Sequence, residues 1–206
     1  MVTAGRSWII AGGITLIALA LRSTYLDQVQ LHPLILVPVA EARLYVESAT
    51  AMAAGGAVSA VQAPFYTWLL AGLDARPEAA RWVQVVLGSL SCALVWAVGR
   101  MAFPPAIALV AALLAAAYGP LIFFTGELLP ATTAVFLSLT FLTAIAWSAR
   151  QPDPWRLTVA GVLLGLTSAC SPSALVLVPL FAAWIARQVP GRLPVSGFTA
   201  GALAAA

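Results

Sequence analysis

The sequence has few charged residues, and none of them is lysine. Asp, Glu, Lys and Arg together make up 8% of the 206 residues, and all ten basic residues are Arg. A soluble domain usually carries about 25% charged residues, so the composition excludes a water-soluble globular fold. Basic runs and aromatic-interleaved basic patches are also absent, and nucleic acid is therefore not an expected partner.

Cysteine and histidine are scarce as well. Cys92 and Cys170 lie inside apolar stretches, where a small buried hydrophobic residue is the simplest interpretation. His32 is the single histidine, and we expect it to pack in a loop. Because no Cys/His cluster has metal-ligand spacing, the sequence predicts no metal site and no cofactor.

Hydrophobic residues, in contrast, make up 62% of the chain. A helix that crosses about 30 Å of hydrocarbon needs about 20 mostly apolar residues. Apolar segments occur at 8–21, 82–99, 106–124, 131–147, 155–170 and 174–185, with another beginning near 195. We therefore predict an all-α fold: a polytopic transmembrane helical bundle of six to seven spans, forming a single transmembrane domain over residues 1–206.

The first apolar segment has an alternative interpretation. Ala18-Leu19-Ala20 is similar to a signal-peptidase site, so the segment could be a cleaved signal peptide. Several more hydrophobic segments follow, however, and a polytopic protein usually keeps its first helix. We favour an uncleaved anchor.

The arginines predict the orientation, because short cytoplasmic loops retain basic residues. With a cytoplasmic N-terminus, the inner side has a single acidic residue, Asp153, and the outer side has the other six. The inner arginines are then Arg6, Arg100, Arg150, Arg156, Arg187 and Arg192, and the outer ones are Arg22, Arg43, Arg76 and Arg81. The expected location is the inner (plasma) membrane, with multiple spans.

Residues 22–81 form the one long segment that is not predicted to span, and long ordered loops are usually functional. We expect two interfacial helices in this first extracytoplasmic loop. One covers 41–54 and is stopped by Gly55-Gly56, and an aromatic one starts at Pro64.

Helical spacing places Glu41 and Tyr45 on one face of the first of these helices. A carboxylate and a phenol would then lie at the outer leaflet boundary, near Arg43 and Arg81, at the depth of a lipid phosphate. The alternative is a solvated face on which Arg43 and Glu47 form a minor ion pair. Glu127 is a second acid at an outward turn, with an exposed interfacial carboxylate as its alternative.

Five segments, taken in order, resemble one enzyme family: EARLY from Glu41, QAPFY from Gln62, RWVQVVLG from Arg81, YGPLIFFTGELL from Tyr118, and GVLLGL from Gly161. Together they are similar to the membrane glycosyltransferases of family 39 type, GT-C fold enzymes related to protein O-mannosyltransferases and aminoarabinose transferases. The resemblance covers about 41–187 and implies the N-terminal membrane half of a longer protein.

The resemblance implies inverting transfer of a sugar from a polyprenyl-phosphate donor to an acceptor protein or glycan on the extracytoplasmic face. Glu41, where the family usually has Asp, would be the catalytic base. Arg43 or Arg81 would stabilise the departing phosphate. The expected donor-phosphate or acceptor residues are Arg43, Tyr45, Gln62, Tyr66, Arg81 and Glu127.

Two departures from the family pattern favour a second hypothesis. Glu41 replaces the usual Asp, and Ser171-Pro172 stands where many relatives have Arg-Pro. The alternative is therefore a non-catalytic membrane subunit that retains the scaffold and works with other membrane subunits. A transporter is disfavoured, because the spans show no paired broken segments and almost no intramembrane charge.

Overall fold

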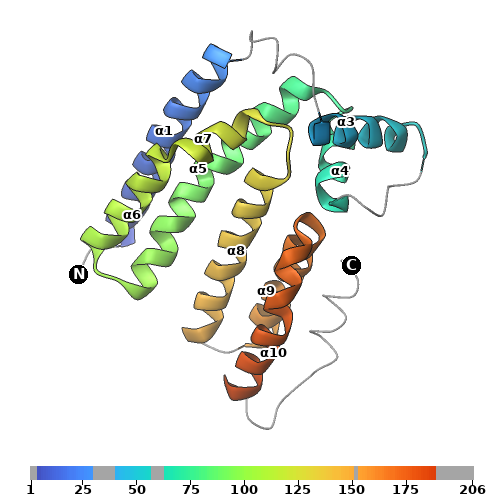
Figure 1. Ribbon diagram of the computed structural model, residues 1–206. Helices are drawn as coiled ribbons and strands as arrows, with labels where there is room; N and C mark the ends of the chain where they lie inside the picture. The colour runs from blue at the N-terminus through green and yellow to red at the C-terminus, as the bar shows by residue number, and fades with distance from the viewer. Residues whose placement is uncertain (1–3, 30–39, 57–62, 151–152, 189–206) are drawn as a thin grey trace.

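The computed structural model describes residues 4–29, 40–56, 63–150 and 153–188, and within these ranges every regular element is a helix. The helices are α1 (Ala4–Val29), α3 (Ala40–Ala53), α4 (Pro64–Ala71), α5 (Pro77–Ala102), α6 (Pro105–Ala117), α7 (Gly119–Gly126), α8 (Ala131–Arg150), α9 (Pro154–Cys170), the 3-10 helix η1 (Pro172–Val176) and α10 (Leu177–Gln188). The all-α prediction is confirmed (Figure 1).

Three of the described helices are long and apolar enough to cross a membrane: Ser7–Val29 within α1, α5 and α8. A fourth span is formed if α6 and α7 count as one, although they bend by 45° at their junction. The described residues thus contain three or four helices that are long enough to span, fewer than the six to seven spans expected from the sequence. The 17 residues of α9 cover about 26 Å, just short of a typical hydrocarbon core of about 30 Å. The segment expected from 195 lies outside the described residues.

Proline sets the start of several of these helices. Pro64, Pro77, Pro105 and Pro154 are the first residues of α4, α5, α6 and α9. Proline is well suited there, because its φ is already helical and the amide that it lacks would have no helical partner. Asp153 also caps α9 by accepting a hydrogen bond from the Trp155 amide at 3.3 Å.

Small residues allow α1, α5 and α6 to approach closely. Ala108, Ala112 and Ala116 of α6 are buried against Ala18 of α1 and Cys92 and Trp96 of α5. A Cβ on Gly99 would lie 3.0 Å from the Cβ of Ala108. Such small-residue contacts favour helix association in membranes, where apolar burial gives little driving force.

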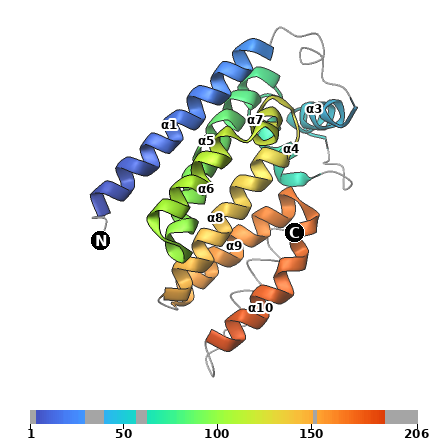
Figure 2. The same cartoon turned by 60° about the vertical axis from the view of Figure 1, so that its left-hand side comes forward.

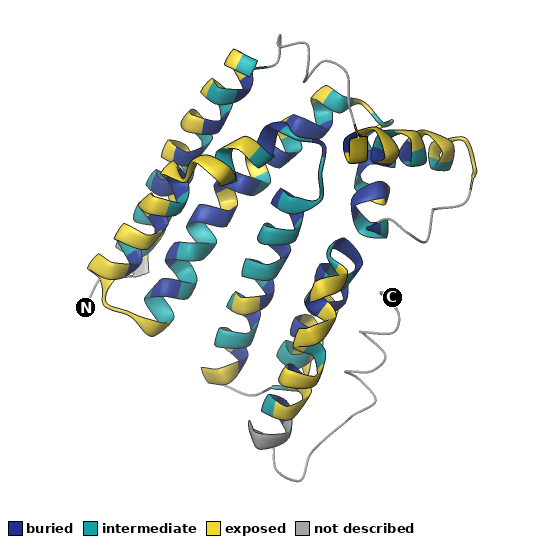
Figure 3. Cartoon of the chain, viewed as in Figure 1, coloured by how far each residue is buried: buried dark blue, intermediate teal, exposed yellow. Residues whose placement is uncertain are grey.

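The outward surface of the bundle is apolar, as expected if it faces lipid. Ile107, Val110 and Leu114 of α6 are 53%, 56% and 66% exposed. Figure 3 shows exposed residues running along the outer sides of α1 and α6. Such a surface is unsuited to water, which confirms that the chain is a multi-pass membrane protein.

Exposed tryptophans mark the two ends of the bundle. Trp68 and Trp82 lie at the end where α4 and α5 begin, and Trp147 and Trp155 lie at the opposite end, where α8 ends and α9 begins. The guanidinium carbon of Arg156 is 4.2 Å from the centroid of the Trp147 ring. Tryptophan and arginine at such positions are typical of membrane–water interfaces.

The two helices expected between the first and second spans are present, α3 within one residue of its predicted start and end and α4 starting at Pro64 as predicted. Figures 1 and 2 show α3 lying across the end of the bundle. The flanking helices are longer than expected. Because α1 continues to Val29 and α5 starts at Pro77, Arg22 and Arg81 lie inside helices rather than in the loop.

Candidate functional site

Five helices meet at the α3–α4 end of the bundle. Their buried contact surface includes Ala42, Tyr45 and Ala49 of α3, Tyr66 and Leu70 of α4, Ala80 of α5, Leu128 of the turn between α7 and α8, Leu137 of α8, and Cys170 at the end of α9. The turn that carries Glu127 therefore lies at the same end of the bundle as α3 and α4. The sequence predicted that these segments share one side of the membrane.

Gln84 of α5 is the centre of this end. Its side-chain NH2 group donates to the carbonyl oxygens of Thr125 at 3.3 Å and Glu127 at 2.7 Å. Its side-chain oxygen accepts a hydrogen bond from the Tyr66 hydroxyl at 3.2 Å. These carbonyls lie at the C-terminal end of α7, where helical carbonyls lose their intrahelical donors. Gln84 satisfies two of them and joins α4, α5 and α7.

Arg81 contributes the third contact to the end of α7. Its Nε donates to the carbonyl oxygen of Gly126 at 3.0 Å, and the residue is only 9% exposed. The carboxylate of Glu127 is close enough to Arg81 for a favourable charge–charge interaction. Consecutive carbonyls 125, 126 and 127 are thus all bonded by α5 side chains, which hold the Glu127 turn in place.

Tyr45 and Tyr66 connect α3 to α4. Their rings meet edge to face with centroids 5.2 Å apart, and both are buried. Burial raises the pKa of each phenol above its ordinary value, and for Tyr45 a hydrogen bond with the Ala63 backbone opposes that rise. Glu41 contributes a smaller increase to the pKa of Tyr45, so its carboxylate acts on the phenol one turn away.

The two charged residues at the start of α3 are exposed. Glu41 is exposed. Exposure is compatible both with a catalytic base that an acceptor can reach and with a solvated carboxylate that has no catalytic role. Arg43 is 70% exposed, and its Nε lies 2.6 Å from Glu47 Oε1, the i,i+4 pair weighed as the alternative from sequence. The structure thus brings Tyr45, Tyr66, Arg81 and Glu127 together, with Glu41 at their edge and Arg43 directed elsewhere.

Gln62 and His32, both singled out from the sequence, lie outside the described residues. Ser171, at the position where the resemblance to the family implies arginine, lies in the turn between α9 and η1, and its Oγ is 2.9 Å from Ser173 Oγ. Gln84 was not singled out from the sequence, although a lone amide side chain within an apolar span is a recognisable signal.

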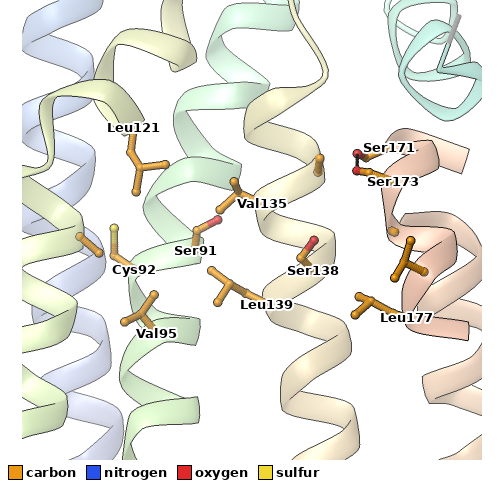
Figure 4. Close-up of a pocket in the computed structure, with 14 residues that line it drawn as sticks. Ser91, Cys92, Val95, Leu121, Val135, Ser138, Leu139, Ser171, Ser173 and Leu177 are labelled. Carbon is orange, nitrogen blue, oxygen red and sulfur yellow. Dashed lines mark hydrogen bonds between the residues drawn. The ribbon is translucent and has the colours of Figure 1, made fainter. Parts of the chain in front are cut away.

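A groove of about 780 Å³ lies between α5, the α6–α7 pair, α8 and the η1–α10 segment. Figure 4 shows Val95, Val135, Leu139 and Leu177 around it, with the hydroxyls of Ser91 and Ser138 as the polar groups between α5 and α8. Ser171 and Ser173 line it beside η1. No charged residue is among the described residues that line it. The groove is therefore suited to a neutral apolar chain.

The fold and this end of the bundle define a multi-pass helical membrane protein with a polar cluster at one face. A family model described as dolichyl-phosphate-mannose-protein mannosyltransferase matches residues 60–205. This match covers well over half of the chain, and the chain belongs to that family. The GT-C mannosyltransferase-like fold expected from sequence is thereby confirmed. Neither the curated proteins nor the solved structures include a match.

The matched residues begin after α3 and include Tyr66, Arg81, Gln84 and Glu127. Glu41, Arg43 and Tyr45 precede them. Family membership therefore rests on the bundle and on the Glu127 turn. It gives no information about α3, which carries Glu41, Arg43 and Tyr45.

Proposed function

We propose that the protein is an inverting glycosyltransferase that moves a sugar from a polyprenyl-phosphate donor to an acceptor protein or glycan on the extracytoplasmic face. The observation that carries this proposal is the convergence of α3, α4, Arg81 and the Glu127 turn on one end of the bundle, above a groove without charge. A lipid-linked donor needs this combination, because its tail is apolar and its phosphate is anionic.

In this reaction Glu41 is the general base. It takes the proton of the acceptor hydroxyl, whose oxygen forms a bond to the anomeric carbon as the bond from that carbon to the phosphate oxygen breaks. Attack from the opposite side inverts the anomeric centre. The exposure of Glu41 supports this role, since an acceptor entering from the aqueous side can reach it.

Arg81 is the cation that we place beside the phosphate. The negative charge of the phosphate grows as the bond to the sugar breaks, and a fixed cation in a site that excludes water stabilises that charge. Arg81 fits this need because it is buried and held by the Gly126 carbonyl. Arg43 is less well placed, since it is exposed and paired with Glu47. Tyr45, Gln62, Tyr66 and Glu127 complete the set that we assign to the donor phosphate or the acceptor.

The groove between α5 and α8 is our proposed site for the isoprenoid tail. The tail would lie among Val95, Val135 and Leu139, with its phosphate directed toward the α3–α4 end. The proposed placement has a cytoplasmic N-terminus in the plasma membrane. In this placement α9 and the η1–α10 segment are short spans that tilt less than the others or locally thin the bilayer, which brings the number of spans toward six or seven.

A matched pair of variants on α3 tests the proposal. Glu41→Gln removes the base and keeps the shape of the side chain, whereas Glu47→Gln removes a carboxylate of the same helix that the mechanism does not use. With polyprenyl-phosphate mannose as donor and protein-bearing vesicles, we expect Glu41→Gln to lose most transfer and Glu47→Gln to retain it. Equal turnover in both variants would move the base to Glu127, which Glu127→Gln then tests.

The alternative is a non-catalytic subunit that kept the family scaffold. The observations that favour it are Ser171 in place of arginine, and an exposed Glu41 in place of aspartate. In that case the wild-type protein shows no transfer with any lipid-linked sugar, and the lipid-binding groove is its remaining function.

A further inference from the structure

A buried arginine lies inside the bundle and is not part of the polar cluster described above. Arg22 of α1 is 1% exposed. Its Nη1 donates to the carbonyl oxygens of Ala18 at 3.3 Å and Ala116 at 3.4 Å, and the sulfur of Cys92 lies within its hydrogen-bonding reach. A cation inside a membrane bundle is unfavourable and is usually functional.

The Ala116 carbonyl has a specific reason to need a side-chain donor. In an α-helix the carbonyl of residue i accepts from the amide of residue i+4. For Ala116 that residue is Pro120, which has no amide hydrogen. The chain is extended at Tyr118, with φ −72° and ψ 108°, and α6 ends there. A carbonyl left without a donor within the bilayer is strongly unfavourable.

We propose that Arg22 supplies the hydrogen-bond donor that Pro120 lacks, and that it thereby holds the 45° bend which directs α7 toward the α3–α4 end. Figure 1 shows α7 turning away from α6 and crossing α5 toward the start of α8. The C-terminal end of α7 is held by Arg81 and Gln84. Side chains of neighbouring helices thus hold the last turn of α6 before the bend and the end of α7 after it.

Space for this arrangement is provided by Gly88 of α5. A Cβ there would lie 3.0 Å from Arg22 Nε and 2.9 Å from the Thr125 methyl group. Arg22, Gly88 and Thr125 therefore bring α1, α5 and α7 into one contact. Arg22 acts as a positioning residue for the Glu127 turn, and only this link to turnover rests on the proposed function.

The test measures the bend directly, with spin labels at Ile107 of α6 and Phe123 of α7, which are 53% and 47% exposed. The variants are Arg22→Met, which removes all the donors, Arg22→Lys, which keeps a positively charged donor group, and Pro120→Ala, which restores the amide. A label pair at Leu90 and Leu142 on α5 and α8 reports whether the bundle is intact, and protein without introduced cysteines shows whether buried Cys92 and Cys170 react.

We expect Arg22→Met to broaden the distance distribution across the bend and Arg22→Lys to preserve it. In the double variant with Arg22→Met and Pro120→Ala, α6 can continue as a straight helix into α7. The distribution of distances between the two labels should then narrow again, near the axial length of sixteen helical residues, about 24 Å. If Arg22→Met does not fold, recovery of the folded bundle by Pro120→Ala supports the proposal.

The proposal is overturned if Arg22→Met leaves the distribution unchanged, or if its effect on distance or folding is the same with Pro120 and with Ala at that position. The measurement uses no substrate. Its outcome is therefore independent of the proposed transfer reaction, and an intact bend in an inactive protein would count against the proposed function alone.

Discussion

The Tyr66 hydroxyl donates a hydrogen bond of 3.2 Å to the side-chain oxygen of Gln84, and both side chains are fully buried. Gln84 also donates to the carbonyl oxygens of Thr125 and Glu127. One amide side chain therefore joins the loop helix α4 to the turn that carries Glu127. Substitution at this point separates the parts of the proposed site from each other.

Gln84→Leu should destabilise the protein more than Tyr66→Phe. The first change leaves the Tyr66 hydroxyl and the Thr125 carbonyl without Gln84 as their partner, while the Glu127 carbonyl keeps only the Leu129 amide. The second change leaves only the side-chain oxygen of Gln84 without a partner. Each stranded buried group costs about 1–3 kcal/mol. Thermal unfolding in mild detergent measures the difference, with Tyr118→Phe as a matched control because Tyr118 is 56% exposed. Equal midpoints for all three variants would contradict the network.

Stability should also fall in alkaline solution. Burial raises the pKa of Tyr45 and Tyr66 above the ordinary value of 10.0, so the folded state holds these protons more tightly than the unfolded state. Their contribution is complete below pH 10 and is lost as the pH rises further. The chain has no lysine that would titrate in the same range.

The measurement is the unfolding midpoint as a function of pH between about 8 and 11, the range around the ordinary tyrosine pKa. A variant with both Tyr45→Phe and Tyr66→Phe is expected to show a shallower decline than the wild type. The same slope in both proteins would mean that these phenols are not protected in the folded state.

Gly88→Ala tests the contact between α1, α5 and α7. The added methyl group meets the Thr125 methyl at 2.9 Å and Arg22 Nε at 3.0 Å. Overpacking of this kind costs about 1–3 kcal/mol. Gly12→Ala is the matched control, because no atom lies within 4 Å of a Cβ at Gly12 and alanine favours the helix. Unfolding midpoints should fall for Gly88→Ala only.

Features set by neighbouring residues were predictable from the sequence, and those set by distant ones were not. The helix at Pro64 follows from a local proline, and the end of α3 follows from Gly55, whose φ is +87°. The hydrogen bond from Arg22 to Ala116 joins residues 94 apart, and a count of charges placed Arg22 in a loop. Gln84 likewise gains its role from partners 41 and 43 positions away.

The bend between α6 and α7 is an intermediate case. The sequence indicated one continuous apolar segment at 106–124, because hydropathy does not register a change of direction. Tyr118-Gly119-Pro120 contains the local signal, since proline lacks an amide hydrogen for the preceding helix and is favoured in the first turn of a new one. The direction of α7 after the break depends on contacts with Arg22, Arg81 and Gln84. No local sequence pattern indicates these contacts.

The proposed orientation, with a cytoplasmic N-terminus, predicts which positions are accessible from outside the cell. Thr50 of α3 and Arg150 of α8 are both exposed and lie at opposite ends of the bundle. Thr50→Cys should react with an impermeant maleimide in intact cells, and Arg150→Cys only after permeabilisation. Cys92 and Cys170 are buried and should give a low background. The reverse labelling pattern would place α3 in the cytoplasm.

The central claim is that the bundle holds a polyprenyl phosphate, and mass spectrometry of the lipid retained after purification from native membranes tests it most directly. The wild type is expected to retain a polyprenyl phosphate, with or without a sugar. Ser138→Trp, which fills the groove, should retain much less, whereas Val110→Trp on the 56% exposed face of α6 should retain as much as the wild type. Bulk phospholipid alone in the wild type, or equal polyprenyl phosphate in all three proteins, would contradict the account.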